Sequence, residues 1–225
     1  MPDAQRLKSR ASYDRNVFIK CPFDDSYEPI FRGLVFTVFE CGLVPRCAKE
    51  AYDSGQVRME KILGIIGECR WGIHDISRTD LNDRGLPRFN MPLELGLFLG
   101  ARRFGHDFQR RKSCIVLDHS PYRYQAFISD IAGQDIAAHD NRPERAIRLV
   151  RDWLATEKAG IPNPPGGAAI AARHAVFERE LPALCAQTHR SSAELTYIEF
   201  ADLVSTWLKQ ELTRRVPKPD TGAQR

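Results

Sequence analysis

The sequence has no long hydrophobic run. A helix that spans a bilayer needs about 20 consecutive apolar residues, and charged residues or glycines interrupt every apolar stretch of this chain. Residues 1–30 also have no apolar core of the kind found in a signal peptide. We therefore expect no role in which the protein spans or inserts into a membrane.

Cysteine patterns typical of metal or redox sites are missing. The six cysteines form no CxxC pair and lack the histidine spacing of a zinc site. Most of them lie inside apolar runs, which is typical of small buried thiols in a reducing compartment. We expect a cytoplasmic protein that holds no metal.

Several catalytic and nucleotide-binding motifs are absent too. The chain has no GxGxxG after its first expected strand, no GxxxxGK[ST], no GxSxG and no HExxH. These absences exclude a Rossmann fingerprint, a P-loop, a serine hydrolase elbow and a zincin. The 33 basic residues exceed the 29 acidic residues by only four, giving a net charge of +4. That excess is too small to indicate nucleic-acid binding.

What the chain does contain is a regular alternation of short apolar strands and amphipathic helices. The expected strands lie at residues 17–19, 43–48, 71–76, 113–118 and near 136. The expected helices lie at residues 27–42, 62–69, 90–99, 122–131 and 143–157, the first ending at Gly42. This alternation predicts a flavodoxin-like α/β three-layer sandwich with a mainly parallel five-stranded sheet.

Four parts are expected along the chain. Residues 1–15 are polar and basic and predict a flexible N-terminus, and residues 16–158 form the α/β domain. A segment rich in proline and glycine, 161–167, precedes a helical appendage at 168–213, which is too small to hold a good core alone. Residues 214–225 are expected to be a flexible tail.

The strongest catalytic candidate is Glu94. In an open parallel sheet, ligands bind at the carboxyl ends of the strands, and Glu94 is expected in the first turn of the apolar helix after the third strand. The helix dipole there favours an ionised carboxylate, which could stabilise the oxocarbenium-like state of glycosidic cleavage. The alternative is that Glu94 only complements the dipole.

Five further residues could line the same cleft, each with a structural alternative. Asp75 could orient a ribose hydroxyl or cap the following loop, and Asp24 could bind substrate or cap the helix near Tyr27. Phe23 could stack on a base or form a hydrophobic staple. Arg46 could reach a phosphate or lie solvated at the rim, and Asn90 could cap its helix or face the ligand.

Two other features are assigned structural roles. His74 lies on a strand and is expected to be a core residue rather than a catalytic base. A basic cluster is expected to be a solvated surface rather than an anion or partner site; its members are Arg102, Arg103, Arg110, Arg111 and Lys112.

Three segments resemble those of TIR domains and nucleoside 2-deoxyribosyltransferases. They are NVFIKCPFDD at residues 16–25, the strand that ends at Asp75, and NMPLELG at residues 90–96. The resemblance covers roughly residues 16–137 and implies a flavodoxin-like sheet with Glu94 as the catalytic residue. It further implies that Phe23, Asp24 and Asp75 line a nucleoside or NAD pocket.

Three functional hypotheses follow. The first is an N-glycosidase that cleaves NAD or a related nucleotide, as bacterial TIR-like proteins in phage defence do, with Glu94 stabilising the ribosyl cation and Asp75 positioning the ribose. NAD would be a substrate, and no cofactor would be needed. The second is a TIR-like module without catalysis that binds a nucleotide or forms a homo-oligomer. The third is a deoxyribosyltransferase, which would need an acceptor base.

Overall fold

The structure is a computed structural model that describes residues 10–50, 55–79, 85 and 88–215. Its centre is a five-stranded sheet in which every pair of neighbouring strands is parallel. The strands are β1 (Asn16–Lys20), β2 (Val44–Arg46), β3 (Trp71–Asp75), β4 (Ser113–Asp118) and β5 (Ile136–Ala138). Their order across the sheet is β2-β1-β3-β4-β5, which is the flavodoxin-like order predicted from the sequence.

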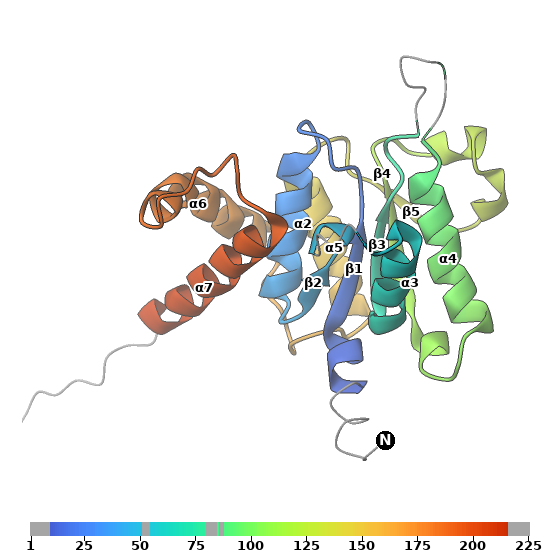
Figure 1. Cartoon of the computed structure of the whole chain (residues 1–225), viewed down its shortest axis with the longest axis horizontal. Helices are drawn as coiled ribbons and strands as arrows, with labels where there is room; N and C mark the ends of the chain where they lie inside the picture. The colour runs from blue at the N-terminus through green and yellow to red at the C-terminus, as the bar shows by residue number, and fades with distance from the viewer. Residues whose placement is uncertain (1–9, 51–54, 80–84, 86–87, 216–225) are drawn as a thin grey trace, which may run out of the picture. The chain divides into compact units, whose positions relative to one another are not determined.

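Helices cover both faces of this sheet (Figure 1). One layer contains α2 (Glu28–Glu40) and α5 (Pro143–Thr156), which pack against each other, and the other contains α3 (Arg58–Glu68) and α4 (Asn90–Phe104). All five residues of β1 and all five of β3 are buried. Strands covered on both faces read as continuous apolar runs, which is why these two were recognisable in the sequence.

The predicted stop of α2 at Gly42 is confirmed in detail. Gly42 has a φ of 73°, a left-handed conformation that glycine adopts readily. Its N–H donates to the carbonyl of Phe39, and the N–H of Leu43 donates to the carbonyl of Val38. These two bonds form a Schellman motif, which satisfies carbonyls at the end of the helix.

The segment 122–131 differs from the predicted helix. It contains two short 3₁₀ turns, Arg123–Ala126 and Ser129–Ile131. Tyr122 precedes the first turn with a left-handed φ of 60°, and the Arg123 side chain binds groups at the ends of β3 and β4. These tertiary contacts outweigh the helical periodicity of the segment.

The chain divides into two compact units, Met1–Ala175 and Val176–Arg225, so the division falls inside α6 (Gly167–Ala186) rather than at the linker 161–167. The start of α6 belongs to the first unit, where Arg173 pairs with Glu40 of α2 at 2.9 Å. Residues 10–15, expected in a loose terminus, are helical. The sequence also predicts a turn at residues 53–55 and a polar loop at residues 77–90; residues 53 and 54 and much of that loop lie outside the described residues.

The second unit is built around α7 (Tyr197–Arg215) and the C-terminal part of α6. Thr196 and Glu199 form a capping box, in which each side chain accepts a hydrogen bond from the other residue's backbone N–H. The sequence predicts a helix over residues 192–212 here, and this box explains why α7 begins at Tyr197 instead. The helix then continues through Arg215, into the segment expected to be a tail.

No helix among the described residues is long and apolar enough to cross a membrane.

Candidate functional site

The candidate site lies where β1 and β3 end side by side. The connection from β1 leads to β2 on one side of the sheet, and the chain then returns to β3 on the other side of β1. A parallel sheet opens a crevice at such a switch point, outside the carboxyl ends of the strands. Lys20 is the last residue of β1, Asp75 is the last residue of β3, and α4 is the next helix along the chain after β3.

A buried ion pair joins β1 to α4 at this point. Lys20 Nζ lies 2.5 Å from Glu94 Oε1, and the two side chains are only 5% and 4% exposed. The second carboxylate oxygen, Oε2, is also buried and has no hydrogen-bond partner among the described residues. In the Glu94 carboxylate, one oxygen therefore binds an ammonium group, and the other has no hydrogen-bond partner among the described residues.

Burial raises the pKa of Glu94 above its ordinary value of 4.5. The attraction of Lys20 and its hydrogen bond lower the pKa, as does the more distant charge of Arg58, but the loss of hydration outweighs them. The ionised form of Glu94 thus depends on the cation beside it.

Glu94 does not lie in the first turn of its helix as the sequence suggested. The N-cap of α4 is Phe89, so Glu94 is the fifth helical residue, and the first turn contains no acidic residue. The helix dipole acts mainly on groups in the first turn. The partner that stabilises the Glu94 carboxylate is consequently Lys20, a residue that the sequence analysis did not select.

α4 is also less buried than its composition suggested. Met91, Glu94, Leu95 and Phe98 are buried, but Leu93 is 49% exposed. Asn90 is the first residue of the helix, is exposed, and makes no capping hydrogen bond with its side chain. Asn90 lies four residues before Glu94 on the same helix, but its side chain shares no hydrogen bond or ion pair with Lys20 or Glu94 among the described residues.

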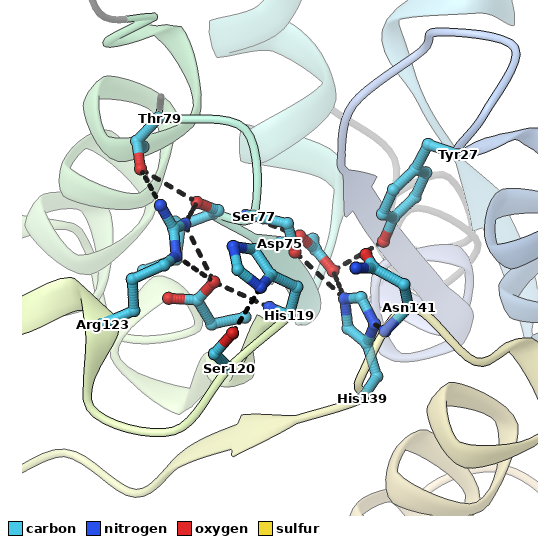
Figure 2. A network of polar contacts seen from close by, with 11 residues as sticks. Tyr27, Asp75, Ser77, Thr79, His119, Ser120, Arg123, His139 and Asn141 are labelled. Carbon is cyan, nitrogen blue, oxygen red and sulfur yellow. Dashed lines mark hydrogen bonds and ion pairs between the residues drawn. The ribbon is translucent and has the colours of Figure 1, made fainter. Parts of the chain in front are cut away.

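Asp75 is the centre of a second, fully buried network (Figure 2). Its Oδ2 accepts hydrogen bonds from the hydroxyl of Tyr27 at 2.6 Å and from Nε2 of His139 at 2.9 Å, and its Oδ1 accepts one from the backbone N–H of Ser77 at 2.8 Å. Asp75, Tyr27 and His139 are each 0% exposed or nearly so. A ribose hydroxyl would have to displace one of these donors to reach Asp75.

The network fixes the tautomer of His139. Its Nδ1 accepts a hydrogen bond from the backbone N–H of Asn141 at 3.1 Å, so the ring hydrogen is on Nε2. Both Asp75 Oδ2 and Ser77 Oγ, at 2.9 and 3.0 Å, face that same Nε2 (Figure 2). In a hydrolytic triad the acid and the serine face different ring nitrogens, so this group ties the ends of β3 and β5 together and does not activate Ser77.

Arg123 makes a third set of contacts at the same edge of the sheet. Its guanidinium donates to Asp118 Oδ1 at 2.9 and 3.0 Å, to Thr79 Oγ1 at 2.9 Å and to the carbonyl of Ile76 at 2.7 Å (Figure 2). Burial raises the pKa of Asp118, opposed by Arg123. Neither Arg123 nor Asp118 stood out in the sequence, although Asp118 ends a strand just as Asp75 does.

Asp24, in the segment after β1, does not cap α2 as its structural alternative proposed, because the N-cap is Tyr27 and makes no capping hydrogen bond with its side chain. Asp24 Oδ1 accepts from the N–H of Tyr27 at 3.2 Å, and its other oxygen pairs with Arg78 at 3.3 Å. Hydrogen bonds from Ser26 and Arg78 and the charge of Arg78 outweigh desolvation and lower the pKa of Asp24.

The half-buried ring of Phe23 packs edge-on against Phe31, with centroids 5.4 Å apart. Lys20 Nζ and Lys49 Nζ lie 5.8 and 4.8 Å from the centroid of the same ring. Phe23 is therefore the one aromatic candidate that lies near the Lys20–Glu94 pair.

Arg46 is held by acidic side chains. It binds both carboxylate oxygens of Glu50, at 2.6 and 2.8 Å, and Glu68 at 3.0 Å. These contacts raise the pKa of Arg46. Among the described residues no hydrogen bond or ion pair joins Arg46 to Glu94.

His74 is a buried core residue, as expected. It is 0% exposed and lies between the rings of Phe18 and Phe98, with centroids 5.7 and 4.9 Å away. Neither ring nitrogen has a hydrogen-bond partner among the described residues. Burial lowers its pKa to about 3, assisted by the charges of Lys20 and Lys112, so the ring is neutral.

One member of the basic cluster is buried, contrary to expectation. Lys112 is 2% exposed, and its Nζ donates to the carbonyls of Ile66 and Cys69 at the end of α3. The other four members are exposed. Within the described residues, no group of three or more acidic, cysteine or histidine side chains could hold a metal ion.

Comparison with known proteins adds no relative: no protein-family model matches the chain, and no curated protein matches it.

Proposed function

We propose that this protein is a nucleotide N-glycosidase that cleaves the nicotinamide–ribose bond of NAD or a related nucleotide, with Glu94 as the catalytic residue. The observation that carries the proposal is the Glu94 carboxylate at the β1/β3 switch point, buried, charge-compensated by Lys20 and with Oε2 unused. The resemblance of residues 16–25 and 90–96 to TIR domains supports the choice of substrate.

The proposed reaction suits a single carboxylate. The bond between C1′ and the pyridinium nitrogen breaks, and its electron pair goes to that nitrogen, which leaves as neutral nicotinamide without needing a proton. The remaining ribosyl group is an oxocarbenium-like cation, which Glu94 stabilises. Water then attacks C1′ and releases one proton, so NAD and water yield nicotinamide, ADP-ribose and a proton.

The other networks have structural roles in this proposal. Asp75, with Tyr27 and His139, holds the end of β3, and Arg123 with Asp118 holds the end of β4 beside it. Asp75 is thus a positioning residue for the end of β3 and for Ser77, and not a group that touches the ribose.

The proposal extends to a cytoplasmic location and to a role in phage defence. All six cysteines are free thiols, and burial raises the pKa of Cys69 to about 12, which keeps that thiol protonated and inert. Free thiols of this kind support a reducing compartment. The defence role rests on the resemblance to bacterial TIR-like proteins.

Chromatography of purified protein tests the reaction. The protein is incubated separately with NAD and with deoxynucleosides plus a free base, at several concentrations so that activity that needs a homo-oligomer is detected. Release of nicotinamide supports the proposal, and base exchange would assign the chain to the deoxyribosyltransferases. No turnover at any concentration would contradict an enzymatic role and favour a nucleotide-binding module.

A further inference from the structure

The carboxylate that the proposed reaction needs is neutralised in this structure. An ammonium group 2.5 Å from Glu94 Oε1 cancels most of the charge that a ribosyl cation would meet. Both side chains are almost completely buried, so water screens the pair little. The pair must therefore open, or at least loosen, before Glu94 can stabilise a cation fully.

Opening the pair requires another anion for Lys20. Leaving one partner of a buried ion pair without a counter-charge is unfavourable by roughly two orders of magnitude or more in the equilibrium constant. Two acids on the neighbouring segments are already committed, because Asp24 pairs with Arg78 and Asp75 accepts hydrogen bonds from Tyr27 and His139. Asp25, the other acid after β1, is exposed to water, which weakens its attraction for a buried ammonium group. The replacement anion is then supplied by the ligand.

A phosphate is the anion that distinguishes a nucleotide from a nucleoside. Lys20 ends β1 and so lies at the edge of the sheet where a ligand binds. The exchange requires its long side chain to turn from Glu94 to a phosphate while the strand stays in place. An ammonium group is also a common partner for phosphate in proteins.

We propose that Lys20 exchanges Glu94 for a phosphate of the substrate, which frees the catalytic carboxylate and makes Lys20 the residue that selects nucleotides over nucleosides. This inference rests on the proposed function of Glu94. It predicts that NAD is cleaved and that nicotinamide riboside, which has the same scissile bond and no phosphate, is a poor substrate.

A binding measurement tests the exchange without any turnover. Inorganic pyrophosphate is titrated into the full chain by calorimetry. Glu94→Gln removes the competing charge, so pyrophosphate should bind about tenfold more tightly or better than to the wild type. Lys20→Met should abolish binding. Unchanged affinity in either variant would overturn the inference.

Two further variants keep the test interpretable. Lys49→Met removes a cation that also lies over Phe23 but is one-third exposed and pairs only loosely with Glu28 at 3.8 Å, so its affinity for pyrophosphate should change only a few-fold. If Lys20→Met does not fold, Lys20→Met with Glu94→Gln removes both buried charges together. That double variant should fold and fail to bind pyrophosphate, and binding by it would overturn the inference.

The activity test compares kcat/KM for NAD with kcat/KM for nicotinamide riboside. The wild type should favour NAD by about a hundredfold or more, and in Lys20→Met the ratio should fall toward one. Both substrates meet the same enzyme, so the ratio does not depend on how much of Glu94 is ionised. An unchanged ratio would contradict the role of Lys20. Absence of any cleavage, together with the predicted binding pattern, would contradict the proposed reaction alone.

Discussion

Lys20 and Glu94 form a buried ion pair in which Nζ and Oε1 are 2.5 Å apart, and it joins the end of β1 to the second turn of α4. The pair brings opposite charges to the switch point of the sheet. Removing one member leaves the other charge buried alone, whereas removing both restores neutrality. We therefore expect the behaviour of the site to depend on pH and, if the proposed exchange occurs, on the charge of the ligand.

In the pH profile of kcat/KM, which reports the free enzyme, the acid limb should lie above pH 4.5. Glu94 must be ionised to stabilise a ribosyl cation, and burial raises its pKa above that ordinary value. Activity is therefore lost as the pH falls through the raised pKa. In Lys20→Met the limb should move to still higher pH, because Lys20 lowers the pKa of Glu94. A limb at or below pH 4.5, or one that does not move in the variant, would contradict this account of the pair.

Tyr27→Phe should reduce the free energy of unfolding by about 1–3 kcal/mol, because Asp75 loses a buried donor at 2.6 Å. Urea denaturation measures the change. Tyr124→Phe is the matched control, since Tyr124 is also buried but its hydroxyl donates to no described group. We expect the control to lower the free energy of unfolding by well under about 1 kcal/mol. Equal losses in both variants would show that the Asp75 network contributes little to the stability of the fold.

His74→Leu should remove part of the acid sensitivity of the fold. His74 titrates near 6.5 when unfolded, and burial lowers its pKa to about 3 in the folded protein. Between those values the unfolded state binds the extra proton, so wild-type stability falls as the pH is lowered from 6.5 toward 3. Between pH 7 and pH 4.5 the wild type should lose about 2 kcal/mol more than the variant.

Urea midpoints at the two pH values provide this comparison. His106→Gln, a substitution of an exposed histidine, should leave the wild-type pH dependence in place. Identical pH dependence in the wild type and His74→Leu would contradict the burial of a neutral ring.

The sheet could be predicted because its signals are local. β1 and β3 are apolar on both faces, and Gly42 ends α2 with a motif that its own neighbours complete. The segment 122–131 could not be predicted in the same way. Its backbone is determined by the contacts of Arg123 with Asp118 and Ile76, which depend on the folded arrangement of β3 and β4.

In the candidate site, too, features of a single segment could be predicted from the sequence, and contacts between distant segments could not. Glu94 stood out as the one acid in an apolar helix, but its partner Lys20 read as the polar end of a strand. Arg46 and Asp75 became candidates because of their positions at the ends of strands. Position alone does not show that Arg46 is bound by Glu50 and Glu68. Nor does it show that Asp75 is bound by Tyr27 and His139. The partners come from distant parts of the sequence, so only the folded structure shows which side chains are already bound.

The most direct test of the central claim is nicotinamide release from NAD by the wild type and by Glu94→Gln, measured by chromatography beside Glu60→Gln, which removes an exposed acid from α3. Circular dichroism establishes that all three proteins are folded. The account predicts that Glu94→Gln lowers the rate by about a hundredfold or more and that Glu60→Gln does not. Full activity in folded Glu94→Gln would contradict it.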